Sequence, residues 1–320
     1  MIDIDGNDAI DLGVTLGSLD WPTPVALASG TCGYGEELDG LIDWSAVGAI
    51  FTKGLSLAPR AGNPAPRIWE TPSGMLNAIG LENVGVAAFL RDKMPFLRRW
   101  RAEHGGCVIV NLFATSVQEY VELTRRLDDV DGIDGIEINL SCPNVSEGGI
   151  EFGRTAAGCA RVTAAVRGAT RKWIAVKLTP ASVVAEVAGA SADAGADALS
   201  VANTIPAMAI DIQSRRPRLW RVTGGLSGPA FRPIALRMVY EARRACALPI
   251  IGIGGIARGE DAVEFMLAGA TAVQVGTATF TNPNAAAEVC RGVRGYLASQ
   301  GEVAARDIVG TLATQEPQTH

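Results

Sequence analysis

Five lysine and asparagine side chains stand at or near the ends of short apolar runs in this sequence. They are Lys53, Asn111, Asn139, Lys177 and Asn203. Buried lysine and asparagine are disfavoured unless they are paired, so a hydrogen bond at a strand end explains any single one best. Five on the same face instead indicate a planar ligand, because lysine neutralises a developing anion and asparagine offers both a donor and an acceptor. A flavin ring, together with a second planar ligand that has imide and carboxylate groups, fits this set.

Cys142 is the best candidate for proton transfer. It follows the apolar run that ends near Asn139, in the polar segment NLSCPNVSEGG, whose two glycines suit a lid. A thiol has a pKa of about 8.5, lowered near cations, so it can act as a base near neutrality. By contrast, Cys107 begins an apolar run and Cys159 lies in a helical pattern, so we expect both to be inert packing residues.

Other acid–base and metal-binding residues are scarce. The two histidines, His104 and His320, lie near no predicted strand end, so we expect neither histidine acid–base chemistry nor a histidine-rich metal site. Glu137 lies within an apolar run and is more typical of a buried structural acid than of a base. The six cysteines include no C-x-x-C pair, so the sequence predicts neither a zinc site nor a loop for an iron–sulfur cluster.

Glycines end two of the later apolar runs. Gly254 and Gly255 lie in GIGGI, and Gly276 precedes Thr277 in VGT. Glycine permits tight turns, but the loops after strands seven and eight of a TIM barrel also form its usual phosphate site, where backbone N–H groups converge on the anion. The segment GGLSG at 224–228 can complete such a site, so we expect a phosphate-bearing ligand here.

Eight short runs rich in valine and isoleucine alternate with helical patterns along the chain. Their nearly continuous apolar character is typical of strands buried on both faces of a parallel sheet. Eight strand–helix units in about 280 residues indicate a (β/α)8 TIM barrel, with a doubly wound open sheet as the competing fold. The runs cover 25–29, 49–53, 107–113, 135–141, 173–178, 198–204, 249–255 and 272–278.

Several segments lie outside this repeat. Residues 11–23 are expected to form an N-terminal hairpin that plugs one end of the barrel, and 305–320 a short C-terminal tail. The connections 54–83 and 205–227 are too long for simple loops, so we expect small hairpins over the C-terminal face, where barrel active sites occur. No change of composition marks a domain boundary, so 1–320 is predicted to be a single domain.

The composition excludes several classes of function. The chain has 320 residues, 48% of them hydrophobic, and a net charge of −6, which allows a sizeable core but gives no basic footprint for nucleic acid. No apolar run approaches the roughly 20 residues that a membrane-spanning helix needs. The acidic start MIDIDGNDAIDLG lacks the basic and apolar regions of a secretory signal, so we expect a cytoplasmic protein without membrane contact.

The motifs NLSCPN, NAIGLEN and AIDI…VTGGLSGPA resemble those of class 1 dihydroorotate dehydrogenases, above all the catalytic subunit of class 1B enzymes. The resemblance extends from about residue 10 to about residue 300. Related flavoprotein barrels that reduce other pyrimidines typically carry histidine after SCP, whereas Asn144 stands here and favours dihydroorotate. Class 2 relatives have serine at the Cys142 position and a membrane-associating extension, and this sequence has neither.

The resemblance implies an FMN-binding barrel with one FMN per chain, and it carries residue roles over by position. Cys142 is implied as the catalytic base, and Lys53 as a further catalytic residue. The residues implied to bind FMN are Ser29, Lys53, Gly54, Asn111, Asn139, Lys177, Ala202, Gly228, Gly254, Gly255, Gly276 and Thr277. The residues implied to bind substrate are Lys53, Asn77, Ala78, Ile79, Gly80, Leu81, Asn139, Asn144, Asn203 and Thr204.

The resemblance also implies the reaction. Cys142 takes a proton from C5 of (S)-dihydroorotate, C6 gives a hydride to flavin N5, and the product is orotate, for pyrimidine biosynthesis. In class 1B enzymes a second subunit with FAD and a 2Fe-2S cluster passes the electrons to NAD. This chain has no cysteine cluster of its own. The resemblance therefore implies such a partner, with a homodimer of this chain inside a heterotetramer.

Three alternatives stay open. One is an FMN barrel that acts on another pyrimidine or a cyclic imide. Another is a flavin- or phosphate-binding subunit without catalysis, and the third is an aldolase-like barrel that forms a Schiff base through Lys177 or Lys53. One departure from the family pattern is the pair Trp220 and Arg221, which stands ahead of VTGGLSG where smaller residues are expected.

Overall fold

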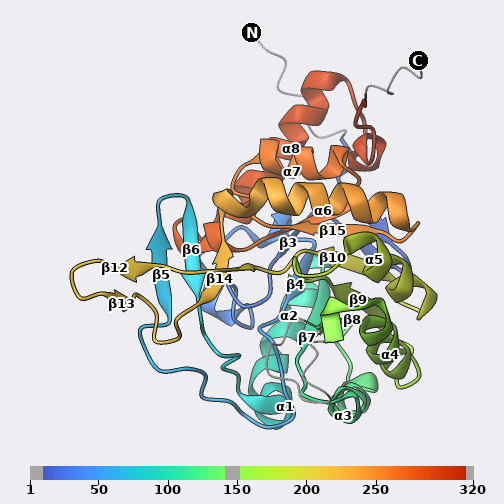
Figure 1. Ribbon diagram of the computed structural model, residues 1–320. Helices are drawn as coiled ribbons and strands as arrows, with labels where there is room; N and C mark the ends of the chain where they lie inside the picture. Colours follow the sequence, from blue (N-terminus) through green and yellow to red (C-terminus); the bar gives the residue numbers. More distant parts are fainter. Residues whose placement is uncertain (1–9, 141–151, 315–320) are drawn as a thin grey trace, which may run out of the picture.

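A closed barrel of eight short parallel strands lies at the centre of the structure (Figure 1). The computed structural model describes residues 10–140 and 152–314. The pairing of the last barrel strand with the first, Val273 opposite Val25, closes the sheet, so the TIM barrel is confirmed and the open doubly wound sheet is wrong. The strands are β3 (Val25–Leu27), β4 (Ala49–Phe51), β7 (Cys107–Leu112), β8 (Gly135–Asn139), β9 (Trp173–Lys177), β10 (Ala198–Val201), β15 (Ile250–Ile253) and β16 (Ala272–Val275).

Each strand ends before the predicted apolar run does. The run at 198–204, for example, is a strand only over β10, and its last three residues belong to the loop at the C-terminal end of the barrel. The same holds for 49–53, where Thr52 and Lys53 follow β4. Of the residues that follow β4 and β10 in these two runs, Lys53, Ala202, Asn203 and Thr204 line the cavity described below, so the prediction overstated the strands mainly at positions of the cavity wall.

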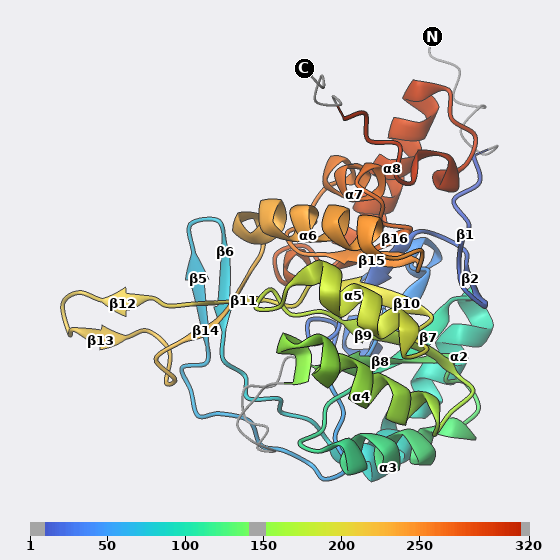
Figure 2. The ribbon, with the colours of Figure 1, turned by 45° about the vertical axis from the view of Figure 1, so that its right-hand side comes forward.

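Helices surround the barrel, as Figures 1 and 2 show. They are α1 (Gly85–Ala88), which continues through η4 (Phe89–Lys93) into α2 (Met94–His104), α3 (Val117–Asp128), α4 (Ala156–Arg167), α5 (Val184–Asp193), α6 (Arg232–Ala245), α7 (Gly259–Leu267) and α8 (Ala285–Gln300). Short 3-10 turns are η2 (Glu36–Leu38), η3 (Trp44–Ala46), η5 (Phe152–Arg154), η6 (Pro229–Phe231), η7 (Thr277–Phe280) and η8 (Ala305–Ile308).

The first strand–helix unit departs from the prediction of eight regular units. Between β3 and β4 the chain forms only the 3-10 turns η2 and η3, and no α-helix. Gly33, Gly35 and Gly40 in this connection all have positive φ, a conformation that cannot continue a right-handed helix. The barrel is therefore covered by a helix after every strand except the first.

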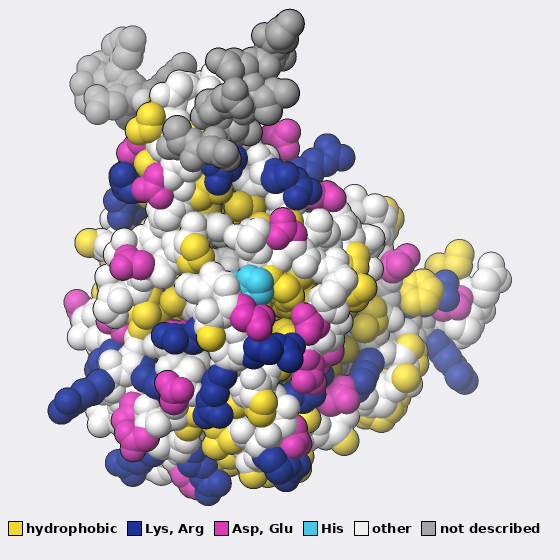
Figure 3. All heavy atoms as spheres, turned by 180° about the vertical axis from the view of Figure 1, so that it is seen from behind, with side chains coloured by type: hydrophobic (Ala, Val, Ile, Leu, Met, Phe, Trp, Pro, Cys, Tyr) yellow, Lys and Arg dark blue, Asp and Glu magenta, His cyan; other side chains and the backbone are white. Residues whose placement is uncertain are grey.

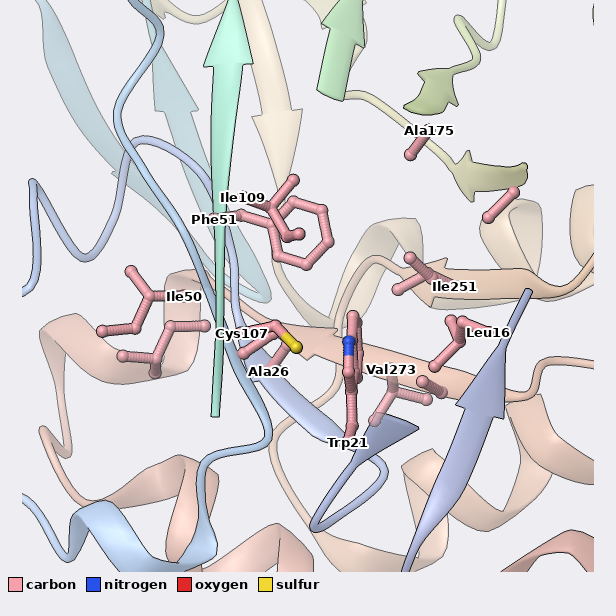
Figure 4. Packing of buried hydrophobic residues seen from close by; sticks show 14 of the residues in the cluster. Leu16, Trp21, Ala26, Ile50, Phe51, Cys107, Ile109, Ala175, Ile251 and Val273 are labelled. Carbon is pink, nitrogen blue, oxygen red and sulfur yellow. The ribbon is translucent and has the colours of Figure 1, made fainter. Parts of the chain in front are cut away.

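The N-terminal hairpin closes one end of the barrel, as predicted for 11–23. It consists of β1 (Val14–Leu16) and β2 (Leu19–Trp21). Figure 4 shows the Trp21 ring directed into the cluster of buried side chains inside the barrel. The ring packs edge-on against Phe51 with 5.9 Å between centroids, and the carbonyl oxygen of Leu16 accepts a hydrogen bond from the indole of Trp173 at 2.8 Å. Aromatic burial of this kind anchors the hairpin firmly.

The two long connections pair with each other beyond the C-terminal end of the barrel. They form a four-stranded antiparallel sheet in the order β11 (Ile205–Ala207), β14 (Gly224–Ser227), β6 (Gly74–Asn77) and β5 (Ile68–Thr71). This confirms the expected hairpins, but it joins segments about 150 residues apart, which no local pattern predicts. The sheet becomes one wall of the cavity described below.

An arm extends outward from this sheet (Figures 1 and 2). It carries β12 (Ile210–Asp211) and β13 (Arg216–Pro217), and its apolar side chains Met208, Ile210 and Ile212 are exposed. Trp220 is also exposed, although its backbone N–H donates to the carbonyl oxygen of Pro66 at 2.7 Å. Clustered exposed apolar residues are typical of surfaces that contact another molecule.

The remaining surface has no single-sign character on the face that Figure 3 shows, where lysine and arginine side chains alternate with aspartate and glutamate. This agrees with the absence of a basic footprint in the composition. Within residues 10–140 and 152–314, no helix has both the length and the apolar character that crossing a membrane requires.

Candidate active site

A cavity of about 1420 Å³ lies between the C-terminal end of the barrel and the four-stranded sheet. Its volume exceeds the roughly 300–1,000 Å³ that is usual for one small ligand, so it can hold two. Every predicted site residue in the described part of the chain lines it: Ser29, Lys53, Gly54, Asn77, Ala78, Ile79, Gly80, Leu81, Asn111, Asn139, Lys177, Ala202, Asn203, Thr204, Gly228, Gly254, Gly255, Gly276 and Thr277. The other two, Cys142 and Asn144, lie outside the described residues.

The floor of the cavity rests on a buried carboxylate. Glu137 of β8 has no exposed surface, and its Oε2 accepts a hydrogen bond from Nδ2 of Asn111 and lies 3.5 Å from Nζ of Lys177. Its Oε1 accepts from Nε2 of Gln274 at 3.3 Å. Three strands thus supply partners to one carboxylate, as buried charges require. The expected burial of Glu137 is confirmed, and Asn111 and Lys177 are the cavity-lining residues of this cluster.

One polar atom on the floor is left without a partner. Oδ1 of Asn111 is fully buried and accepts no hydrogen bond from the described residues. A buried orphan acceptor is costly, so it points to a ligand that donates a hydrogen bond there. The atom lies beside Gly54, where an added Cβ would come within 3.0 Å of it. Together with the ammonium of Lys177, it gives the floor one acceptor and one cation, which fits the edge of a flavin ring.

The side chains of Asn139 and Asn203 meet at the ends of β8 and β10. Nδ2 of Asn203 donates to Oδ1 of Asn139 at 3.2 Å, while its Oδ1 accepts from the backbone N–H of Thr204 at 2.8 Å. The hydroxyl of Tyr120 donates to the carbonyl oxygen of Asn139 at 2.6 Å and so holds the end of that strand. These contacts fix which atoms the two amides present to the cavity.

Lys53 belongs to an ion cluster that the sequence did not predict. Its Nζ lies 3.9 Å from Oε2 of Glu82, and the same oxygen lies 2.6 Å from Nη2 of Arg67. All three residues line the cavity and are partly exposed. Such partly exposed ion pairs contribute little to the stability of the fold. Their effect here is to orient the side chain of Lys53 toward Glu82. The only hint in the sequence was that Glu82 directly follows NAIGL.

The NAIGL segment leads from β6 to that ion cluster. Nδ2 of Asn77 donates to the carbonyl oxygen of Gly225 at 3.3 Å, which ties the segment to β14. Gly80 and Leu81 both have positive φ, of 78° and 59°. Non-glycine residues rarely adopt this conformation, and where they do the backbone is often held for a functional reason. The tight turn brings Glu82 back toward Lys53.

The predicted phosphate loops come together at the other end of the cavity. Gly228, Gly254 and Gly255 all have positive φ, and a Cβ on Gly255 would lie 2.7 Å from the carbonyl oxygen of Gly228. The hydroxyl of Thr277 donates to that of Ser227 at 2.8 Å, so the two loops are joined. Close backbone approach without side chains is what an anion cradle needs. Gly276 has negative φ, so its turn does not demand glycine in the same way.

Three buried cysteines outside the cavity are unsuited to proton transfer. Burial raises the pKa of the Cys32, Cys107 and Cys159 thiols to about 12, and none of them lines the cavity. This confirms the expectation of inert packing for Cys107 and Cys159. A thiol that stays protonated across the neutral range cannot act as a base there.

Comparisons with known proteins agree with this geometry. The family model described as dihydroorotate dehydrogenase matches residues 11–297. A protein of Geobacter sulfurreducens called "Dihydroorotate dehydrogenase B (NAD(+)), catalytic subunit" is 54% identical over 303 residues, which cover 94% of this chain and 98% of the relative. Proteins with the same name from Trichlorobacter lovleyi and Pelobacter propionicus are 53% and 52% identical, again over 94% of this chain and 98% of each relative. The chain therefore belongs to the dihydroorotate dehydrogenase family.

Proposed function

We propose that this chain is the catalytic subunit of an NAD-linked dihydroorotate dehydrogenase, which converts (S)-dihydroorotate into orotate in de novo pyrimidine biosynthesis. The observation that carries the proposal is the gathering of the predicted flavin- and substrate-binding residues around one cavity. The names of the relatives, which specify a catalytic subunit and NAD(+), support it.

FMN is the proposed cofactor, and when bound it takes up the two electrons that the substrate loses. Asn111 and Lys177 would face its ring from the floor, since one offers an unpaired acceptor and the other a cation. The glycine turns would hold its phosphate. The further FMN-binding residues proposed here are Ser29, Lys53, Gly54, Asn139, Ala202, Gly228, Gly254, Gly255, Gly276 and Thr277.

The substrate is a planar anion with a carboxylate and an imide. Lys53 supplies a positive charge for the carboxylate, and Asn139 and Asn203 offer amides whose orientation is fixed. We assign the remaining substrate contacts to Thr204, to the NAIGL segment at 77–81 and to Asn144. A buried anion site of this type discriminates strongly against ligands that leave its polar groups unpaired.

Cys142 is the proposed base and takes the proton from C5 of the substrate. The bond electrons of that C–H form the C5–C6 double bond, while the hydrogen at C6 leaves with its electron pair. The alternatives among the described cysteines are weak, because burial raises the pKa of Cys32, Cys107 and Cys159 far above neutrality. Lys53 is proposed to assist by stabilising negative charge on the substrate as the proton leaves.

Electron transfer to NAD needs a partner subunit in this proposal, with FAD and a 2Fe-2S cluster. Across residues 10–140 and 152–314, no three histidine, cysteine or acidic side chains come together in a way that could bind a metal ion. A homodimer within a heterotetramer is the proposed assembly, and the exposed apolar side chains of the arm support some such contact. The cytoplasmic location and the single domain over 1–320 stay predictions.

The open alternatives fit the cavity less well. A Schiff-base lysine needs an amine free to attack a carbonyl, whereas Nζ of Lys177 lies 3.5 Å from the carboxylate of Glu137 and Nζ of Lys53 lies 3.9 Å from that of Glu82. A non-catalytic subunit would not need the ordered amides of Asn139 and Asn203. Action on another pyrimidine is opposed by Asn144 in place of histidine.

The proposal is tested by mixing the purified chain with dihydroorotate under anaerobic conditions. We expect a yellow protein whose absorbance near 450 nm, a rough value for oxidised flavin, bleaches on addition of dihydroorotate but not of dihydrouracil. If the flavin of a yellow protein bleaches only with dihydrouracil, the proposed substrate is wrong. If it bleaches with neither compound, the result supports the non-catalytic flavin-binding subunit. A protein that does not bind FMN would overturn the proposal.

A further inference from the structure

Glu137 lies outside the proposed binding residues, yet its carboxylate organises the cavity floor from beneath. It does not line the cavity, and its side chain is fully buried. Its partners come from three other barrel strands: Asn111 from β7, Lys177 from β9 and Gln274 from β16. The sequence separations are 26, 40 and 137 residues, so the fold itself brings this cluster together.

The carboxylate decides which end of the Asn111 amide faces the ligand. A carboxylate accepts hydrogen bonds, so it takes the NH2 end of the amide, Nδ2. Oδ1 is then left as the free end, buried and without a partner among the described residues, beside Gly54 at the cavity wall. Were Glu137 uncharged and able to donate, the amide could turn over and offer a donor instead.

The same oxygen sets the charge that the floor carries. Nζ of Lys177 lies 3.5 Å from Oε2 of Glu137, and the lysine side chain is only 8% exposed. In such a poorly solvated place the field of the ammonium is strong, and the adjacent carboxylate largely cancels it. Gln274 donates to the other oxygen, Oε1, and so keeps Oε2 turned toward Lys177 and Asn111.

We propose that Glu137 is a positioning residue for the flavin, which fixes Asn111 as an acceptor and offsets the charge of Lys177 beneath the ring. The inference rests on the proposed function, since it concerns bound FMN. It adds a role for a residue that touches neither cofactor nor substrate. Its consequence is that the carboxylate holds the reduction potential of the flavin down, because reduction adds negative charge above a floor that is close to neutral.

The test is the midpoint potential of the FMN-loaded Glu137→Gln variant. Potentials are measured for all variants by equilibration with a reference dye at one fixed pH. Loss of the carboxylate leaves the Lys177 charge uncompensated, so we expect the equilibrium constant for two-electron reduction to rise at least tenfold, about 30 mV. An unchanged or lower potential overturns the inference.

Gln274→Met is the matched control. It removes a hydrogen bond to the same carboxylate and keeps both charges, and Gln274 does not line the cavity. Its potential is expected to stay within threefold of wild type, expressed as the equilibrium constant, a margin of roughly 15 mV. A shift equal to that of Glu137→Gln would show general disturbance of the floor and would also overturn the inference.

Glu137→Asp carries the test if the glutamine variant does not fold. It keeps a negative charge close to Lys177 but shortens the side chain by one methylene, so the hydrogen bond that holds Nδ2 of Asn111 is lost. We expect FMN to bind at least tenfold more weakly with little change in potential, and wild-type affinity would overturn the positioning role. Wild-type protein that binds no FMN at all would instead overturn the proposed function, so the two failures are distinguishable.

Discussion

The side chains of Asn139 and Asn203 are joined by a hydrogen bond of 3.2 Å, in which Nδ2 of Asn203 donates to Oδ1 of Asn139. Asn139 ends β8 and Asn203 follows β10, and these two strands are not neighbours, since β9 lies between them. Because Oδ1 of Asn203 also accepts from the N–H of Thr204, neither end of this amide is free to turn. The pair is therefore a rigid polar edge in the proposed substrate pocket.

Asn203→Asp should weaken substrate binding with little effect on FMN. The carboxylate cannot donate to Asn139, and its charge opposes the carboxylate of dihydroorotate. We expect KM to rise at least tenfold, which corresponds to about 1.4 kcal/mol. Steady-state kinetics with the flavin content measured by absorbance would check this.

Gln300→Glu provides the control for that variant. It makes the same chemical change, amide to carboxylate, on an exposed residue at the end of α8. Its KM should equal that of wild type. A wild-type KM in Asn203→Asp would instead place the substrate elsewhere in the cavity.

Cys142→Ala should slow the reaction at the proton-transfer step. General base catalysis contributes roughly 10²–10⁴-fold, so we expect the rate of flavin bleaching by dihydroorotate to fall by at least 100-fold. FMN should remain bound, because the floor residues Asn111 and Lys177 and the glycine turns proposed to hold it are unchanged in this variant. Anaerobic stopped-flow absorbance measures the rate and the flavin content together.

Cys159→Ala separates that effect from loss of any thiol. Cys159 is buried in α4, and its Sγ donates to the carbonyl oxygen of Phe152 at 3.7 Å, away from the cavity. The bleaching rate should stay at the wild-type value. Equal slowing in both variants would remove Cys142 from the role of base.

The buried thiol of Cys159 should also make stability depend on alkaline pH. Burial raises its pKa from 9.0 to about 12. Below pH 9.0 the folded and the unfolded chain both hold the proton, and the stabilising contribution is complete. Between 9.0 and 12 only the unfolded chain releases it, so the free energy of unfolding falls as pH rises through this window.

At about pH 10 this single thiol should lower the free energy of unfolding by about 1.4 kcal/mol relative to neutral pH. Urea unfolding at both pH values, for wild type and Cys159→Ala, isolates the effect. The alanine variant is less stable at both pH values because the substitution leaves a cavity. Its free energy of unfolding should nevertheless fall less between neutral pH and about pH 10 than that of wild type, by about 1.4 kcal/mol. Equal losses in the two proteins would contradict the assignment.

The barrel could be predicted from the sequence because its strands are continuous apolar runs. The cavity residues Lys53, Asn111 and Asn203 could be predicted because they are polar and stand at or near the ends of these runs. The missing first helix could not, since positive φ at Gly33 and Gly35 appears only in the folded chain. Hydrophobic periodicity indicates which residues of one helix or strand are buried, but it does not predict which residues of another element they contact.

The same limit explains which site residues were missed. The sequence identifies Glu137 only as a buried acid. Its hydrogen bond with Gln274, 137 residues away, is visible only in the folded barrel. Arg67 and Glu82 both lie in the long connection 54–83, whose pairing depends on a sheet formed with distant β14. Trp220 and Arg221 were singled out as a departure, and of the two only Arg221 lines the cavity.

Gly255→Ala should selectively weaken the phosphate end of the cavity. Its φ of 71° disfavours any side chain, and the new Cβ would lie 2.7 Å from the carbonyl oxygen of Gly228 and 2.8 Å from Cβ of Arg232. The turn must shift, so the anion cradle loses its geometry. We expect the Kd for FMN to rise at least tenfold, about 1.4 kcal/mol, in a titration of the flavin-free protein.

Gly189→Ala is the matched substitution outside the cavity. Gly189 lies within α5, and a Cβ added there meets nothing within 4 Å. Alanine in a helix interior stabilises by about 0.5–1 kcal/mol relative to glycine, so this variant should bind FMN like wild type and unfold at a slightly higher temperature. Since both variants add one methyl group, a difference in FMN affinity between them reports the turn itself. Equal, wild-type affinity in both would mean that the phosphate binds away from Gly255.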